Sequence, residues 1–564
     1  MQVSRTLIPP VGLMGVFFGT IVLLVALPVL VVLLGGVFTD TGATWAHLME
    51  TVLKSYVLNT LWLALGVTVG VVIIGTATGW LVAMCDFWGR SWFSWLLLLP
   101  LAAPAYLLAY IYTDFLEYFG LFQRFLRWLF GWQSASDYWF PQVRNLGGAI
   151  VMLVLALYPY VYLLARVAFS QQSAVIIEAS RNLGCNPWRS FVQVALPLAR
   201  PAIVAGTALA VMETLNDIGT VEFFGVSTLS TGIYRTWFSL GDKPAAMQLA
   251  ALLTLFALLV ILIEQWSRGR MRFYQHLGKS PQRYKLGWGR GAIAFLVCGI
   301  PTVLGFFLPL GLMIYMCINV FMAGGSTLDA DLLELPQVVT WDQDLIELGK
   351  NSLLLAIWAA LVGGLLSLLL AYWQRTFHNR FTELAVRLSV MGYGIPGAVI
   401  AVGIMIPLGY IDQRLNEWLD TGLIFSGTIF ALIYAYNIRF LAVAFNSVES
   451  SLAKVRPNLD EASRSLGEGI MGTLWRIHTP LVSGGVVAGM IFLFVDTLKE
   501  LSATVVIRPF NFETLAVRVY TFAADERLYE AALPALAILV AGILPIFWLS
   551  RQISQQDRCT WDLR

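Results

Sequence analysis

Six polar side chains lie in two strongly apolar stretches of this sequence, three in each. A charge at the centre of a bilayer costs on the order of 2.5–3.5 kcal/mol on insertion scales, so it marks function by default. Spacings of three and four residues place each trio on one helical face. Carboxylate oxygens suit hard cations, and they argue against an anionic substrate. The six residues are Glu213, Asn216 and Asp217 in one stretch, and Asp496, Lys499 and Glu500 in the other.

Two interpretations of these trios stay open. In the first, they line a polar path or form the rim of a gate between two parts of the molecule. In the second, they form a structural network in which Lys499 is satisfied by Asp496 or Glu500.

A short polar phrase also occurs twice. Residues 178–184 read EASRNLG and residues 461–467 read EASRSLG, and in each copy a proline follows the glycine by thirteen residues. Glycine permits the positive φ that a helix end often needs, and proline near the start of the next helix costs little. The pattern predicts a helix–turn–helix at the membrane surface, where small side chains let another surface approach. Two such sites fit a partner that comes in two copies.

The elements that carry these residues are predicted to be membrane-spanning helices. The chain has 564 residues, of which 58% are hydrophobic and 12% charged, whereas soluble domains carry about 25% charged residues. The apolar runs reach the roughly 20 residues that a helix needs to cross a bilayer. The first is expected to be an uncleaved span rather than a removed signal peptide. The predicted spans are 11–37, 57–84, 92–113, 146–169, 201–219, 245–266, 291–322, 351–373, 384–409, 423–445, 483–505 and 531–550.

Lysine and arginine set the predicted orientation. Residues 268–290 hold seven basic residues and no acid, whereas residues 323–350 hold six acids and one lysine. The first segment is therefore predicted to be cytoplasmic and the second external, which places both termini in the cytoplasm. The basic segment is interpreted as a topology signal and linker, with contact to anionic lipid as the alternative.

The repeated phrase belongs to a longer internal repeat. METLNDIGT (212–220) lies over VDTLKELSA (495–503) at an offset of 283, and Pro104 lies over Pro396 at 292. Tyr158 and Tyr160 lie over Tyr434 and Tyr436 at 276. An even number of spans separates the copies, so the repeat is parallel.

The predicted organisation is all-α and polytopic, with about twelve helices in two parallel six-helix halves. The first half is 1–267 and contains the first loop, 178–197. The basic linker is 268–290, the second half is 291–550 with the second loop, 461–480, and the cytoplasmic tail is 551–564.

The two loops carry a family resemblance. EAS…G…LP at 178–197 and EAS…G…TP at 461–480 resemble the EAA loop of ABC importer permeases, and the chain is most similar to the fused, twelve-span permeases of the ferric-iron type. The resemblance covers nearly the whole chain. Two segments that look like that subgroup are LYPYVYLLARVAF (157–169) and LSATVVIRPFNFETLAVRVY (501–520). One difference from the family is Thr479, because the family usually has leucine at the position before Pro480.

The resemblance implies the ABC importer permease fold and the partners of such a machine. Each loop would form a coupling helix that docks on one of two copies of an ABC ATPase. A soluble binding protein would deliver iron(III) from outside. The coupling residues carried over are Glu178, Ala179, Ser180 and Gly184 in the first loop, and Glu461, Ala462, Ser463 and Gly467 in the second.

Two arginines and an aromatic segment are predicted on the external side. Arg235 and Arg518 occupy matching outer loops and could meet an anion or the binding protein. Residues 114–145 are aromatic throughout. They are interpreted as helices lying in the membrane interface, with docking of an external protein as the alternative.

The chain itself is predicted to perform no chemistry. A P-loop needs GxxxxGK[ST], and position 273, where Gly278-Lys279-Ser280 would require a glycine, is Phe273. ATP and Mg are therefore assigned to the separate ATPase, and the chain is expected to bind no cofactor and no nucleic acid. Neither the four histidines nor the five cysteines have ligand spacing, so no metal site is assigned. The predicted location is the bacterial cytoplasmic (inner) membrane.

Two alternatives to iron import stay open. The same machinery could import thiamine, phosphonate or another small solute, because permeases for these solutes look similar. A proton-coupled secondary transporter is the second alternative, since Asp86-Phe87-Trp88-Gly89-Arg90 resembles a loop motif of that superfamily.

Overall fold

The structure is a computed structural model, and it is almost entirely helical. It describes residues 13–38, 42–170, 172, 179, 180, 182–268, 283–323, 343–377, 380–420, 422–453, 455, 456 and 458–543. Within these ranges the only strands are β1 (Cys85–Asp86) and β2 (Tyr284–Lys285), which form a parallel pair. Ten helices in the described ranges are long and apolar enough to cross a membrane. The predicted all-α polytopic class is therefore confirmed.

The remaining predicted spans are helical but less regular. Arg90–Ala102 and Ala105–Phe130 form one bent pair that turns by 90° at its break. Leu528–Ile543 is a shorter apolar helix at the last predicted span, and residues 544–550 lie outside the described residues. Each of the twelve predicted segments thus contains helix, although the described helices that pass as full spans number ten, or eleven with the bent pair.

The described residues form two compact units that cut across the predicted halves. Unit 1 comprises Met1–Ala46, Ile233–Thr254 and Trp341–Val517. Unit 2 comprises His47–Gly232, Leu255–Thr340 and Arg518–Arg564. The two halves are defined by the sequence repeat, whereas the two units are defined by which helices pack together.

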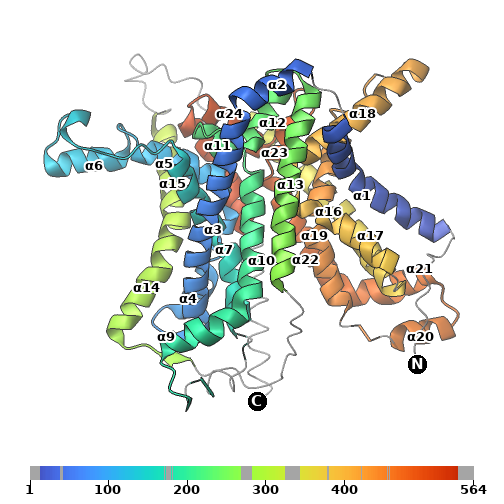
Figure 1. The fold of residues 1–564 in the computed structure, drawn as a ribbon, viewed down its shortest axis with the longest axis horizontal. Coiled ribbons are helices and arrows are strands. Elements are labelled where there is room, and N and C mark those ends of the chain that lie inside the picture. Colours follow the sequence, from blue (N-terminus) through green and yellow to red (C-terminus); the bar gives the residue numbers. More distant parts are fainter. Residues whose placement is uncertain are drawn as a thin grey trace. The chain divides into compact units, whose positions relative to one another are not determined.

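Each unit is built around three long helices. In unit 2, α3 (Leu53–Met84), α7 (Leu146–Ser170) and α10 (Leu196–Asn216) pack against one another (Figure 1). Glycine allows the close approach of α10 to α7, because a Cβ on Gly206 would lie 2.8 Å from the Tyr160 carbonyl oxygen. Close packing through small residues is the usual way for membrane helices to associate.

Unit 1 repeats this arrangement with α16 (Gln343–Thr376), α19 (Ile429–Leu452) and α22 (Thr479–Leu498). Gly489 takes the place of Gly206, with a Cβ 2.9 Å from the Ala444 Cα.

The register of α19 corrects one prediction from the sequence. Helices α7 and α19 begin 283 residues apart, and the close contacts of Gly206 with Val161 and of Gly489 with Ala444 keep the same offset. The tyrosine match at 276 is therefore seven residues out of register. Seven residues are almost two helical turns, so the shift leaves the same face inward and the pattern could not reveal the error.

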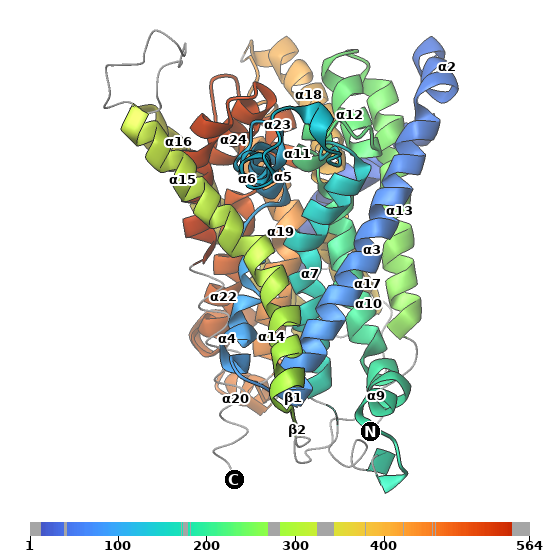
Figure 2. The same cartoon turned by 90° about the vertical axis from the view of Figure 1, so that its left-hand side faces the viewer.

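The first span of each sequence half packs in the unit built mainly from the other half. In unit 1, α1 (Leu13–Phe38) packs on α17 (Arg380–Val390) and α18 (Gly397–Leu419). In unit 2, α14 (Trp288–Thr302) packs on α3, and α15 (Leu308–Ala323) packs on α5 (Ala105–Leu116) (Figure 2).

Both third spans are broken at the same place in the repeat, so the prediction of single helices over 92–113 and 384–409 is wrong. A 3₁₀ turn precedes each break, at η1 (Leu99–Ala102) and η5 (Met391–Gly394). Pro104 and Pro396 follow with nearly identical backbone angles, φ −58° and −57°. Proline lacks an N–H and pushes the preceding residue out of the α region, so the helix stops and restarts after it.

The fifth spans begin earlier than predicted. The helices run from Trp188 to Asn216 and from Ile470 to Leu498, rather than from 201 and 483. Each contains a π-helical turn, η3 (Phe191–Ala195) or η6 (Leu474–His478), and these turns lie 283 residues apart. The short helices before them are α9 (Pro187–Ser190) and α21 (Ile470–Thr473).

The other described helices connect the spans or lie at their ends. They are α2 (Gly42–Thr51), α4 (Arg90–Leu96), α6 (Leu121–Phe130), η2 (Ala135–Asp137), α11 (Gly219–Phe223), α12 (Leu229–Phe238), α20 (Asn458–Ser465), α23 (Ser502–Ile507) and α24 (Leu515–Ala524), and the π turn η4 (Val303–Phe307) lies between α14 and α15. Helix α13 (Lys243–Arg268), in contrast, is itself one of the helices long and apolar enough to cross a membrane.

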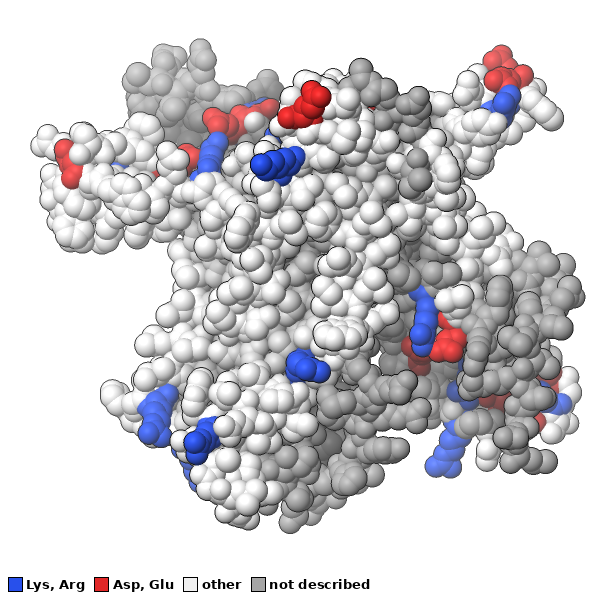
Figure 3. All heavy atoms as spheres, in the orientation of Figure 1, with Lys and Arg blue, Asp and Glu red and all other residues white. Residues whose placement is uncertain are grey.

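The surface agrees with a membrane environment. Most of the face in Figure 3 is uncharged, and large apolar side chains such as Trp62 and Ile73 of α3 are more than half exposed. Such side chains on a long apolar helix are typical of contact with lipid.

Candidate functional site

The second repeated loop is a short helix with a defined end. Helix α20 ends at Ser465, and Gly467, two residues later, has φ +83°. The Glu468 N–H donates to the Ser463 carbonyl at 3.1 Å, and the Gly467 N–H donates to the Arg464 carbonyl at 3.0 Å. These two bonds form a Schellman motif, and glycine is the residue that adopts its left-handed position without strain.

The first loop has the same geometry where it is described. Gly184 has φ +86°, and the Cys185 N–H donates to the Ser180 carbonyl at 3.0 Å. Each of these features lies 283 residues before its counterpart in the second loop. Glu178, the first predicted coupling residue, lies outside the described residues.

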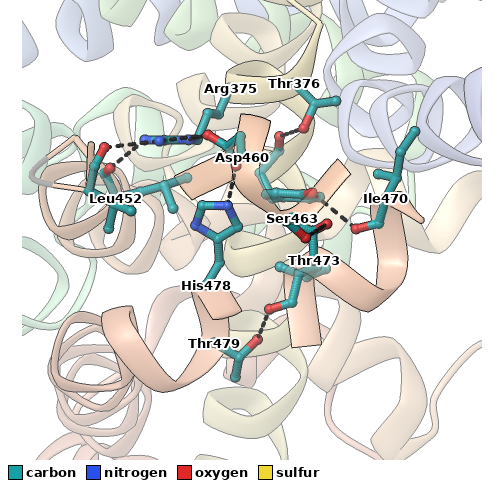
Figure 4. Close-up of polar contacts among 12 residues, drawn as sticks. Arg375, Thr376, Leu452, Asp460, Ser463, Ile470, Thr473, His478 and Thr479 are labelled. Atoms are coloured by element: carbon teal, nitrogen blue, oxygen red, sulfur yellow. Dashed lines mark hydrogen bonds and ion pairs between the residues drawn. The ribbon is translucent and has the colours of Figure 1, made fainter. Parts of the chain in front are cut away.

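The serine of each phrase points inward and ties the loop to the next helix. Ser180 Oγ lies 2.8 Å from Ser190 Oγ, and Ser463 Oγ lies 2.7 Å from Thr473 Oγ1. Both bonds are buried, and Figure 4 shows Ser463 against Thr473. These serines therefore position the loop, while Ala179, Glu461 and Ala462 are exposed.

The outward side of each loop carries a residue that the sequence analysis passed over. Leu183 and Leu466 occupy the same position of the phrase, and both are 85% exposed. A single exposed leucine is common on protein surfaces, so the informative point is that leucine recurs at the same exposed position of both copies. The recurrence of leucine before glycine in both copies was the signal that could have identified it.

A charged network supports the second loop (Figure 4). Asp460 of α20 accepts from Arg375 of α16 at 2.8 Å and lies 2.5 Å from His478 Nε2. Arg375 also donates to the carbonyls of Leu452 and Val455, at 2.7 and 2.9 Å. One guanidinium therefore joins the end of α16, the end of α19 and the loop helix.

The electrostatics of Asp460 favour its ionised form. Burial opposes ionisation, but the bonds from Arg375 and His478 outweigh it and hold the pKa of the Asp460 carboxyl below its usual range. The loop therefore carries a carboxylate at neutral pH.

An aromatic cluster takes the place of this network behind the first loop. The Trp80 ring lies 5.3 Å from Phe169 and 4.8 Å from Phe191, measured between centroids. Trp188 lies 5.5 Å from Phe191. In the repeat, the counterpart of His478 is Ala195. The counterpart of Asp460 is Ile177, which lies outside the described residues.

The last carboxylate of each polar trio caps a short helix. Asp217 accepts from the N–H groups of Thr220 and Val221, both at 3.1 Å, at the start of α11. Glu500 accepts from the Ala503 N–H at 2.8 Å, at the start of α23. Side-chain oxygens at such positions satisfy N–H groups that a helix start leaves open.

The trios differ in their ion pairs. Glu500 pairs with Arg439 of α19, and both side chains are buried. Lys499 Nζ lies 2.9 Å from Asp496 Oδ1. In the register of the structure the counterpart of Arg439 is Ala156, so this buried pair exists in one half only. Arg439 was missed because its partner lies 61 residues away in the chain. Glu213 and Asn216 lie half-buried on α10.

The other predicted site residues are more dispersed. Arg235 lies in α12, and Arg518 lies in α24 with its guanidinium 5.4 Å from the Phe522 ring. Residues 269–282 of the basic linker and the whole tail 551–564 lie outside the described residues. Among the residues that are described, no three His, Cys, Asp or Glu side chains are placed to hold a metal ion.

Two further segments have a defined structure. Asp86 of the predicted transporter-like motif lies in β1, and Arg90 donates to the Val82 carbonyl at 3.2 Å. In the aromatic segment 114–145, α6 exposes Trp128 and the following loop exposes Trp139, 78% and 85% respectively.

Comparison with known proteins identifies a transport-protein domain. Residues 72–273 match the family described as the binding-protein-dependent transport system inner membrane component. This range contains the first loop.

Several curated relatives extend over more of the chain. The Fe(3+)-transport system permease protein FbpB 2 of Haemophilus influenzae is 24% identical over 500 residues, which is 87% of this chain and 89% of that protein. The ferric transport system permease protein FbpB of Actinobacillus pleuropneumoniae is 24% identical over 72% of this chain and 58% of its own length. The molybdenum transport system permease protein ModB of Escherichia coli is 26% identical over 34% of this chain and 83% of that protein.

Proposed function

We propose that this chain, a fused permease subunit of the binding-protein-dependent ABC importer class, carries iron(III) across a bacterial cytoplasmic membrane. A soluble binding protein would deliver the iron from outside. Two copies of an ABC ATPase would bind and hydrolyse ATP with Mg, because the chain itself is a transport subunit and is expected to hold no cofactor. Both termini are proposed to lie in the cytoplasm.

The observation that carries this proposal is the pair of matched loops. Two loops that share a positive-φ glycine and the hydrogen bond across it, each with an inward serine and an outward leucine, suit two identical partner surfaces. A partner that grips both loops could move the two halves against each other when it binds ATP. Rigid attachment of each loop to a long helix, through the serine bond, would transmit that movement into the membrane.

The choice of iron rests on different support. Relatives that cover most of this chain are named as ferric permeases, and the intramembrane carboxylates favour a hard cation. A phosphonate remains the second candidate cargo, because the putative 2-aminoethylphosphonate permease PhnU of Salmonella choleraesuis is 28% identical over 37% of this chain and 73% of that protein.

Reconstitution tests both the machine and its cargo. The chain and its ATPase in lipid vesicles should hydrolyse ATP faster when an iron-loaded binding protein is added. Stimulation only by a thiamine- or phosphonate-loaded protein would overturn the choice of iron. Transport by the chain alone, driven by a proton gradient, would replace the importer by a secondary transporter.

The outward leucines offer a direct test of docking. Leu466→Asp or Leu183→Asp should weaken ATPase binding by about 2 kcal/mol or more, roughly thirtyfold, as for a hot-spot residue at an interface. Leu423→Asp is the matched control, because Leu423 is 72% exposed and lies before α19, at the end of the segment between 409 and 423 that the predicted topology places outside. Equal binding by all three variants would remove the loops as the docking site.

A further inference from the structure

A polar cavity lies in unit 2, at the end of the helices predicted to face outward. Its volume is about 200 Å³, which leaves room for several water molecules. The side chains that line it include Tyr110 of α5, Arg144, Glu222 and Phe223 of α11, Tyr520 of α24, and Glu526. None of these residues belongs to the repeated loops.

The charges around the cavity favour a cation. Arg144 Nε lies 2.8 Å from Glu117 Oε1, and its Nη1 lies 3.1 Å from Glu526 Oε1. The single guanidinium is thus held between two carboxylates, and Glu222 adds a third. Negative charge is therefore in excess over these four groups, which disfavours an anion.

Tyr110 is the feature that points to a ligand. Its side chain is 3% exposed, and its hydroxyl has no hydrogen-bond partner among the described residues. The ring packs edge-on against Phe223, with 4.6 Å between centroids, and the phenol lies within electrostatic range of Tyr520 and Asp217. A buried hydroxyl without a partner is costly, so its presence beside a polar cavity calls for a group that it binds.

The donor types indicate which cation. Phenol and carboxylate oxygens are hard ligands, and hard cations of high charge prefer oxygen. Because no three His, Cys, Asp or Glu side chains in the described part of the chain are placed for a metal, a cation site here needs the tyrosines as donors.

We propose that this cavity is a transit site for iron(III), with Tyr110, Tyr520 and Glu222 as its oxygen donors. The inference rests on the proposed function. On binding, the O–H bond of each phenol breaks, an iron–oxygen bond forms at each phenol oxygen and the two protons leave to water, with no change in oxidation state. The Glu526 carboxylate forms an ion pair with Arg144, so the cavity offers an iron ion few strong oxygen donors. A site with few strong donors holds its ion weakly, which suits passage, since conduction needs binding that also permits release.

The test is spectroscopic and uses the full chain with its ATPase in lipid nanodiscs. Ferric nitrilotriacetate is titrated in, and the visible charge-transfer absorption of iron(III) phenolate is recorded. The native protein should show this band. Tyr110→Phe should weaken iron binding by at least about tenfold, since the loss of even an outer-shell partner of a metal costs that much, and Tyr520→Phe should diminish the band.

Tyr158→Phe is the control, because Tyr158 is a fully buried tyrosine of α7 that does not line the cavity. Its band should match that of the native protein. A native protein without the band, or a Tyr110→Phe variant that binds iron as tightly as the native protein and shows the same band, would overturn the site.

A second measurement separates this site from the proposed function. The iron-loaded binding protein should stimulate ATP hydrolysis equally in native protein and Tyr110→Phe, while uptake of radioactive iron falls in the variant. Stimulation without a phenolate band contradicts the transit site and leaves iron import standing. Absence of stimulation in the native complex contradicts iron import itself.

Discussion

The two repeated loops have the same geometry but are supported by different interactions. Behind the second loop, Asp460, Arg375 and His478 form a charged network. Behind the first, Trp80, Phe169 and Phe191 form an aromatic cluster. The serine bond and the positive-φ glycine are kept in both. The comparison teaches that one loop geometry can be held in place either by ion pairing or by apolar packing.

The largest effect is expected from breaking the charged network. Asp460→Ala leaves Arg375 and His478 without their shared carboxylate in a largely buried setting, which costs about 3 kcal/mol or more. The second loop should detach from α16 and α19, and co-purification of the ATPase should fall.

The double variant Arg375→Leu with Asp460→Leu is the matched control. It removes both charges together, so it should be less harmful than the single change. If Asp460→Ala binds the ATPase as well as the native chain does, the network does not hold the loop.

A smaller effect is expected from the aromatic cluster. Trp80→Ala removes the ring that contacts Phe169 and Phe191, and the cost should be roughly 2 kcal/mol, below the 3–5 kcal/mol of a fully buried tryptophan, because Trp80 is half-buried. Trp80→Phe should restore most of the loss. Thermal unfolding of the detergent-solubilised chain measures this loss of stability, which should not depend on the salt concentration. A marked salt dependence would show that charges also act at the first loop.

Removal of the serine hydrogen bond should destabilise each of the two loops by about the same amount. Ser180→Ala and Ser463→Ala each remove one buried hydrogen bond, worth about 1 kcal/mol. The coupling of ATP hydrolysis to transport should fall modestly and equally in the two variants. A much larger loss of coupling in one variant would mean that the two loops contribute unequally to the coupling of ATP hydrolysis to transport.

The smallest effect concerns pH. Since the pKa of Asp460 is held below its ordinary value of 3.8, its contribution is complete above that value and is lost only as pH falls through the lowered pKa. Between pH 8 and 5 this carboxylate should therefore add no pH dependence to ATPase binding. The ratio of ATPase binding by the native chain to binding by Arg375→Leu/Asp460→Leu should stay constant across that range, and a ratio that changes with pH contradicts the prediction.

The repeat is visible in the sequence because a polar phrase stands out in an apolar chain and occurs twice with the same spacing. The loops, the π turns and the glycine contacts all keep the offset of 283. In contrast, the match of Tyr158 and Tyr160 was misleading, since a shift of seven residues preserves the face of an apolar helix. The breaks at Pro104 and Pro396 had a visible signal in their shared offset, but proline is tolerated within spanning helices and was read in that way.

Other features needed the structure. Arg439 and Glu500 meet across two helices, and nothing in their spacing predicts the pair. The exchange of first spans between units is equally invisible, because an apolar helix presents similar surfaces to any neighbour. The outward leucines were visible in both copies of the phrase, but an apolar residue in a short phrase gives no signal of whether it lies buried or exposed.

The exchange of first spans also has a consequence in time. Helix α1 packs on α17 and α18, and these helices are made about 360 residues after α1 leaves the ribosome. At about 5–20 residues per second that delay is roughly 20–70 s. During this interval α1 lies in the bilayer without α17 and α18, so insertion of this protein and completion of its packing are separate events. Two gene fragments cut at the linker would each encode an incomplete unit, and they would have to meet in the membrane before either could finish folding.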